Sequence, residues 1–121
     1  MTHSHPVDAD GVARAHEAGP AQPDAERLAD LLRLLADPVR LRILFSLLAA
    51  EELCVGDLAL AVGVTDDQSS YALKLLRADG VVQSRRAGRV IHYRLADGFP
   101  QQLLDHCLRQ LLTIASEENT P

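Results

Sequence analysis

Aromatic side chains are scarce in this 121-residue chain: they make up 3% of it, and tryptophan is absent. Since 47% of the residues are nevertheless hydrophobic, a core has to be built from leucine, valine, isoleucine and alanine, and the length suffices for one domain. No apolar run is long enough to cross a membrane, and the first residues lack the basic and then apolar pattern of a signal peptide. We therefore expect a cytoplasmic protein with no membrane partner.

Cysteine is also rare. Cys54 and Cys107 are the only two, and a cytosolic pair this far apart in sequence is not a disulfide framework. Each is expected to be a core thiol or a ligand. The chain has no nucleophile paired with a base, no glycine-rich phosphate loop and no cofactor fingerprint. We therefore expect neither an enzyme nor an organic small-molecule substrate.

Positive charge is concentrated in one stretch. The formal net charge is −5, but six of the 12 lysine and arginine residues lie within residues 74–94, where Asp79 is the only acidic residue. A local basic strip on an acidic body is compatible with specific DNA binding at moderate salt.

Apolar residues recur at helical spacing before this strip. The predicted helices are residues 23–36, 38–50 and 53–62. Gly63 ends the last of them, and a short turn leads to Thr65 and Gln68, whose spacing is that of a capping box at the start of a fourth helix. Helix, short glycine-containing turn and helix is the spacing of a helix-turn-helix.

A basic hairpin is predicted after the fourth helix. Two β-prone runs, residues 81–86 and 89–95, flank a short turn that contains Gly88. The tip is rich in arginine, which a purely structural hairpin does not need. A polar helix followed by a basic hairpin predicts a winged helix-turn-helix fold, mainly α with a β-hairpin wing. The alternative is a solvated hairpin on a small α+β domain.

This fold predicts a double-stranded operator DNA as the partner. The polar helix would contact base edges in the major groove, and the wing arginines would contact phosphates or the minor groove. The predicted DNA-binding residues are Gln68, Ser69, Ser70, Tyr71, Lys74, Arg77, Arg85, Arg86 and Arg89.

A broad apolar stripe marks a last helix over about residues 99–115. The stripe consists of Leu104, Cys107, Leu108, Leu111 and Leu112. In so small a domain a second copy is the expected cover, which gives a homodimer through the first and last helices. The alternative is that this helix folds back on its own core. The DNA-binding and dimerisation domain is thus predicted to span residues 23–118.

Residues 1–22 show neither helical nor strand periodicity and are predicted to form a mobile N-terminal arm. The arm holds three of the five histidines, His3, His5 and His16. Histidine is the commonest metal-binding side chain near neutral pH. The arm is therefore either a metal-binding segment or a tail without function.

Three segments carry a resemblance to a known family. They are residues 36–44 (ADPVRLRIL), 52–59 (ELCVGDLA) and 86–95 (RAGRVIHYRL). Across residues 26–112 the chain resembles the ArsR/SmtB family of metal-sensing repressors. The resemblance implies a homodimeric winged-helix repressor that leaves its operator when metal binds.

The resemblance also implies a sensing site. Cys54 and Asp57 match the family's ligands at the third helix, and a partner subunit's arm, here with His3, His5 or His16, would complete the site. Cys54 and Asp57 are three residues apart in the predicted helix, so they share a face. A mixed sulfur, oxygen and nitrogen donor set suits zinc first, and also cobalt, nickel or cadmium. The alternative is a buried thiol and a carboxylate that only supplies charge at a helix start.

Other sites of the family fit less well. Of the family's terminal-helix site only Asp97 is present, and Gly56 stands where an arsenite site has a second thiolate. Asp105, His106 and Cys107 make a weaker alternative metal or thiol site, because adjacent residues diverge on a helix. Two rival functions remain: a thiol or redox repressor that uses the two cysteines without metal, and a protein-interaction module.

Overall fold

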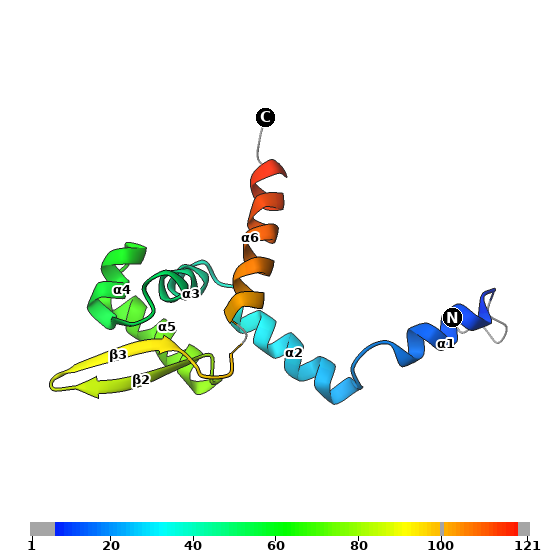
Figure 1. The fold of residues 1–121 in the computed structure, drawn as a ribbon, viewed down its shortest axis with the longest axis horizontal. Helices are drawn as coiled ribbons and strands as arrows, with labels where there is room; N and C mark the ends of the chain where they lie inside the picture. Colours follow the sequence, from blue (N-terminus) through cyan, green and yellow to red (C-terminus); the bar gives the residue numbers. More distant parts are fainter. Residues whose placement is uncertain (1–6, 100, 119–121) are drawn as a thin grey trace. The chain divides into compact units, whose positions relative to one another are not determined.

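The structure of the protein is a computed structural model, which describes residues 7–99 and 101–118. The chain divides into two compact units, residues 1–32 and 33–121. Figure 1 shows the helices and strands along the chain, most of them labelled. Within the part of the chain that the structure describes, no helix is both long and apolar enough to cross a membrane.

The first unit contains helix α1 (Ala9–Glu17) and most of α2 (Gln22–Leu35). Asp8 caps α1, since its side chain accepts a hydrogen bond from the Gly11 amide at 2.8 Å. No residue of α1 is buried. The prediction that the N-terminal arm has no helix is therefore wrong for α1. A side-chain cap and several good helix formers support this helix without the apolar stripe on which the prediction relied.

The second unit continues from the end of α2 through three helices, a sheet and a terminal helix. Its elements are α3 (Pro38–Ala50), β1 (Leu53–Cys54), α4 (Val55–Val62), α5 (Asp66–Ala78), β2 (Val82–Ala87), β3 (Val90–Leu95) and α6 (Gln101–Glu118). Figure 1 shows β2 and β3 as a long hairpin beside α5. This order confirms the predicted winged helix-turn-helix, mainly α with a wing.

The core of the second unit is built from the inner faces of α3, α4 and α5 together with the sheet. Its fully buried apolar side chains are Ile43, Leu44, Leu47, Leu58, Val62, Leu73, Leu76, Val81, Val82 and Leu95. Local signals set the ends of these helices. The Asp37 side chain caps α3 by accepting from the Arg40 amide at 3.0 Å. Gly63 closes α4 in the left-handed conformation, with φ of 76°.

α5 starts at the predicted capping box. The Gln68 amide donates to Thr65 Oγ1 at 3.1 Å, and the Thr65 amide donates to Gln68 Oε1 at 2.9 Å. The two residues thereby satisfy amides that a helix start leaves without partners. Gly80 follows the helix with φ of 74°, and its amide donates to the Arg77 carbonyl at 3.0 Å.

The wing is a three-stranded antiparallel sheet in the order β1–β3–β2, rather than a lone hairpin. Leu53 pairs with Tyr93 and Cys54 with His92. The prediction that the third helix begins at Leu53 is therefore wrong: the extended backbone of these two residues pairs along the edge of β3, and α4 begins at Val55. A pairing with residues so distant in sequence leaves no mark on local helical spacing.

α6 contacts α3 through Arg109, whose guanidinium carbon lies 5.5 Å from the centre of the Phe45 ring. Further along α6, several apolar side chains are more than half exposed. They are Leu111, Leu112 and Ile114. This part of the predicted stripe does not fold back on the core of its own chain. The side chain of Leu104 lies outside the described residues.

Candidate nucleic-acid interface and sensing segment

α5 has one buried face and one exposed face. The buried face consists of Ser69, Ala72, Leu73 and Leu76. The prediction that Ser69 faces outward is wrong, because its side chain is fully buried and its hydroxyl donates to the Val55 carbonyl at 3.1 Å. Ser69 and Leu73 are four residues apart, so they lie on the same side of the helix. The hydroxyl therefore ties α5 to the start of α4.

The other predicted residues of α5 are exposed. They are Gln68, Ser70, Tyr71, Lys74 and Arg77. Tyr71 is 62% exposed although it is a large side chain, and a ring in that position can stack on or pack against bases. Gln68 is partly committed, since its amide group belongs to the capping box. Five of the six α5 residues predicted to contact DNA are thus exposed, and their contact with DNA stays a prediction.

The cations of this region fall into two groups. Within residues 7–99 and 101–118, Lys74, Arg77, Arg86 and Arg89 form no ion pair, and all four are exposed. Arg85 differs from them, because Glu52 binds it. The Arg85 Nε lies 2.8 and 3.0 Å from the two carboxylate oxygens of Glu52, and its Nη2 lies 2.5 Å from Oε1.

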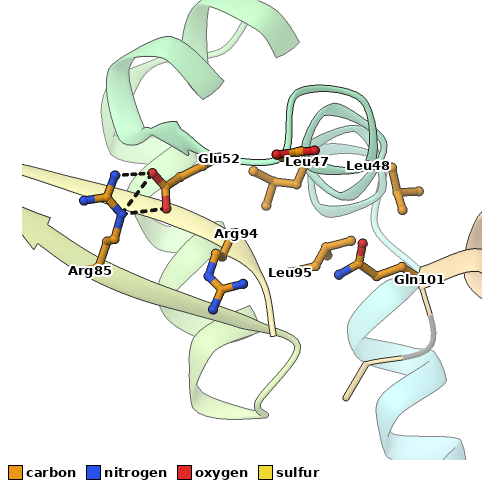
Figure 2. Close-up of a pocket in the computed structure, with 8 residues that line it drawn as sticks. Leu47, Leu48, Glu52, Arg85, Arg94, Leu95 and Gln101 are labelled. Atoms are coloured by element: carbon orange, nitrogen blue, oxygen red, sulfur yellow. Dashed lines mark hydrogen bonds and ion pairs between the residues drawn. The ribbon is translucent and has the colours of Figure 1, made fainter. Parts of the chain in front are cut away.

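The Glu52–Arg85 pair joins the start of the sheet to the wing strand β2 (Figure 2). The hydrogen bond from Arg85 lowers the pKa of the Glu52 carboxyl and raises the pKa of the guanidinium. Arg94 is likewise paired, with Asp97 at 3.1 Å. Both arginines line a pocket of about 550 Å³ that also includes Leu48 of α3. Two of the cations on this side of the wing are therefore already neutralised.

We call residues 52–57 the sensing segment, because they contain the predicted ligands Cys54 and Asp57. Cys54 is half-buried and occupies the N-cap of α4, where its side chain makes no capping hydrogen bond. Asp57 is exposed in the first turn. The two are therefore a cap residue and the third residue of the helix, rather than two residues inside it.

Sequence reasoning missed His92 as a neighbour of the sensing segment. Antiparallel pairing places His92 directly opposite Cys54, so the two side chains lie on the same face of the sheet. His92 Nδ1 also lies 3.9 Å from Glu52 Oε1. No local sequence pattern signals this neighbour, because only the pairing of β1 with β3 brings Cys54 and His92 together.

The remaining predicted ligands belong to other segments of the chain. Across residues 7–99 and 101–118, no three His, Cys, Asp or Glu side chains gather closely enough to hold a metal ion. His16 is exposed in the last turn of α1, in the first unit, and His3 and His5 lie outside the described residues. On α6, Asp105 pairs with Arg109 at 2.6 Å.

The other two members of the alternative α6 site are also exposed. Cys107 is a free thiol on the surface of the helix, and the adjacent His106 is exposed as well. Cys54 is the other free cysteine. Within one chain, neither thiol is joined to a second sulfur.

Residues 37–84 match the family model described as "Bacterial regulatory protein, arsR family". This segment runs from the cap of α3 into the wing and contains the sensing segment and α5. Among curated relatives, the HTH-type transcriptional repressor SmtB of Mycobacterium tuberculosis is 39% identical, over 78% of this chain and 70% of that protein. The chain belongs to the arsR family.

A second relative is the transcriptional repressor SmtB homolog of Synechocystis, which is 44% identical over 65% of this chain. The match spans 59% of that relative, which is less than two thirds of its length. Both relatives are named as repressors, and the arsR family is one of regulatory proteins. Membership confirms the prediction that the chain is not an enzyme.

Solved structures agree with the fold. Rv0081 of Mycobacterium tuberculosis has a TM-score of 0.70 and 31% identity and is covered in full, over 83% of this chain. The antimony-specific repressor AntR has a TM-score of 0.68 and 30% identity, over 86% of this chain and 93% of that chain. The homodimeric winged helix-turn-helix domain of Mb0332 from Mycobacterium bovis has a TM-score of 0.62 and 30% identity, over 85% and 95%.

Proposed function

We propose that this protein is a transcriptional repressor that binds operator DNA as a homodimer and releases it when a divalent transition metal binds. The DNA-binding part of the proposal is supported by the exposed polar face of α5 and by the unpaired cations beside it. It is also supported by relatives that are named as transcriptional repressors.

The homodimer is supported by the apolar face of α6. Leu111 and Leu112 are 61% and 55% exposed in a single chain, and burial of such side chains between two copies is favourable. The related Mb0332 domain is homodimeric. Two copies related by a two-fold axis would present two α5 helices to successive major grooves, as operator reading requires.

One observation carries the metal response: Cys54 lies where the sheet meets the helix pair. It is the last residue of β1, which pairs with the central wing strand, and it caps α4, which is tied to α5 through Ser69. A metal held by Cys54 and Asp57 would therefore act on both DNA-contacting elements. A thiolate and a carboxylate supply half of a tetrahedral zinc site.

The proposed remaining ligands come from the arm of the other subunit, in which His3, His5 and His16 are the histidines. Zinc is the preferred metal for such a donor set, and cobalt, nickel and cadmium are the alternatives. The metal must bind the DNA-free form more tightly than the DNA-bound form. By linkage, DNA then weakens metal binding by the same factor.

The test is a zinc titration of the reduced protein on its own promoter fragment, followed by fluorescence anisotropy. In parallel, Co(II) absorption would report thiolate ligation through a charge-transfer band. The wild type should release DNA and show the band. Cys54→Ser should bind DNA like the wild type but neither release it nor show the band, whereas the matched variant Cys107→Ser should respond normally. A normal metal response in Cys54→Ser would contradict the proposed site.

The rival function is a thiol or redox repressor that uses Cys54 and Cys107 without metal. The observation that favours it is that both cysteines are free and that Cys107 is exposed. Oxidant-driven release that survives a chelator and disappears in Cys107→Ser would establish this rival. Operator binding that oxidants leave unchanged would exclude it.

A further inference from the structure

A second recess lies between the C-terminal half of α5 and the central wing strand β3. Its volume is about 430 Å³. The residues that line it are Ser70, Lys74, Arg77, Ala78 and Tyr93. Four of these come from α5 and one from β3, so the recess forms where the helix and the wing meet.

The chemistry of this recess is that of an oxyanion site. Lys74 and Arg77 supply two positive charges, and none of the described residues that line the recess is acidic. Ser70 and Tyr93 add two hydroxyl groups, which can donate hydrogen bonds. Neither cation forms an ion pair within residues 7–99 and 101–118. The sequence offers no acid three or four residues from either one along α5. A guanidinium, an ammonium and two hydroxyls together suit a phosphate group.

Both walls of the recess are held by the fold. Tyr93 lies in the central strand, opposite Leu53 on one side and Ser84 on the other. Its backbone is therefore fixed by two neighbouring strands. α5 is fixed by its buried face, which includes Ser69 and Leu73. The polar groups of the recess thus need little ordering when an anion enters, which favours binding.

We propose that this recess binds a phosphate of the DNA strand that runs between the groove entered by α5 and the groove reached by the wing. The proposal rests on the proposed DNA-binding function. A helix in the major groove and a wing in the adjacent minor groove have one sugar-phosphate strand between them. The recess lies between the same two elements. Tyr93, which is not among the DNA-binding residues predicted from the sequence, thereby becomes a DNA-contacting residue.

The first experiment measures how operator affinity depends on salt. Lys74→Gln should reduce the slope of log K against log salt by about 0.9, because one phosphate contact is lost. Tyr93→Phe should keep the slope and weaken operator and unrelated DNA by the same factor, about ten- to a hundredfold for one hydrogen bond to a charged phosphate. Thermal melting of each variant checks that the fold is intact.

The second experiment locates the phosphate. A set of operator duplexes, each with one neutral methylphosphonate linkage, is titrated against the wild type, Lys74→Gln and, as a control, Arg94→Gln. One linkage should weaken the wild type and Arg94→Gln but have no further effect on Lys74→Gln. That same linkage should also lose part of its effect in Tyr93→Phe.

These outcomes distinguish failure of the recess proposal from failure of the proposed repressor function. If the wild type binds operator DNA but Lys74→Gln keeps the wild-type slope and every linkage keeps its effect, then the recess holds no DNA phosphate and the inference is overturned. If the wild type shows no preference for its own promoter over unrelated DNA, the proposed repressor function itself fails. Inorganic phosphate at constant ionic strength is the control for free anions. Competition by it equal to that of sulfate supports the DNA strand as the occupant.

Discussion

The two faces of the wing sheet treat positive charge in opposite ways. On one face Arg85 is bound by Glu52 and Arg94 by Asp97. On the other face, Lys74 and Arg77 lie with Tyr93 in a recess whose described lining residues include no acid. Sequence counts them all as one basic strip. The comparison teaches that acidic partners decide which cations are available. Asp97 lies only three residues from Arg94, but Glu52 lies 33 residues from Arg85, where no local pattern indicates it.

The largest expected difference is between Arg77→Gln and Arg94→Gln. Each variant removes one arginine, but Arg94 is paired with Asp97, whereas Arg77 forms no ion pair among the described residues. Arg77→Gln should flatten the salt dependence by about 0.9, which corresponds to about an eightfold loss of DNA affinity near 0.1 M salt. Arg94→Gln should leave both quantities almost unchanged. Anisotropy titrations at several salt concentrations check this, and equal losses in the two variants would abolish the distinction between the two faces.

The next expected effect concerns the packing of the buried face of α5. Ser69→Ala removes the buried hydroxyl that donates to the Val55 carbonyl, and should lower the free energy of unfolding by about 1 kcal/mol. The neighbouring Ser70→Ala removes an exposed hydroxyl and should change stability by less than about 0.5 kcal/mol. Urea unfolding of both variants measures the contrast. A larger loss in Ser70→Ala would mean that the faces of α5 are assigned wrongly.

A smaller effect on DNA affinity is expected when the Glu52–Arg85 ion pair is removed. Glu52→Gln removes the carboxylate that neutralises Arg85 and should raise DNA affinity about threefold, since an exposed ion pair is a weak competitor. The salt dependence should also become steeper. Arg85→Gln provides the control, because Glu52→Gln should have no further effect in that background. Weaker DNA binding in Glu52→Gln would show that the pair positions the wing for DNA rather than withholding a charge.

The smallest expected effect is a change in the pKa of Glu52. Because the hydrogen bond from Arg85 lowers the pKa of Glu52, the contribution of this carboxylate to stability is present above its unfolded-state pKa. That contribution is lost as the pH falls through the lower pKa of the folded state. Carboxyl NMR shifts should place the folded-state pKa below the usual glutamate value. In Arg85→Gln the pKa of Glu52 should rise. An unchanged pKa of Glu52 would show that Arg85 does not act electrostatically on it.

Features coded by neighbouring residues were predictable. The capping box at Thr65 and Gln68, the helix start at Pro38 and the turn at Gly88 depend on a few consecutive residues, and the structure has all three. Helical spacing also predicted which residues of α5 are exposed, with Ser69 as the exception. The family resemblance, which depends on short sequence motifs, was also confirmed.

Features that depend on distant pairing were missed. β1 forms only because β3 offers an edge, so Cys54 was placed in a helix instead of a strand end. The Glu52–Arg85 pair and the opposition of Cys54 and His92 have the same origin. Ser69 was missed for a different reason: serine is small and polar, and its burial is stabilised by one acceptor on another helix. No periodicity rule signals such an acceptor.

The register of β3 limits how the length of the wing can change. His92 faces Cys54, whereas the next residue, Tyr93, faces the recess beside α5. Since alternate residues of a strand point to opposite sides, a one-residue insertion or deletion in the turn at Gly88 would exchange these two side chains between faces. Substitutions at the tip keep this register, but an odd change of length would turn the Tyr93 side chain away from α5. Natural variation in this hairpin should therefore consist of replacements and of paired insertions.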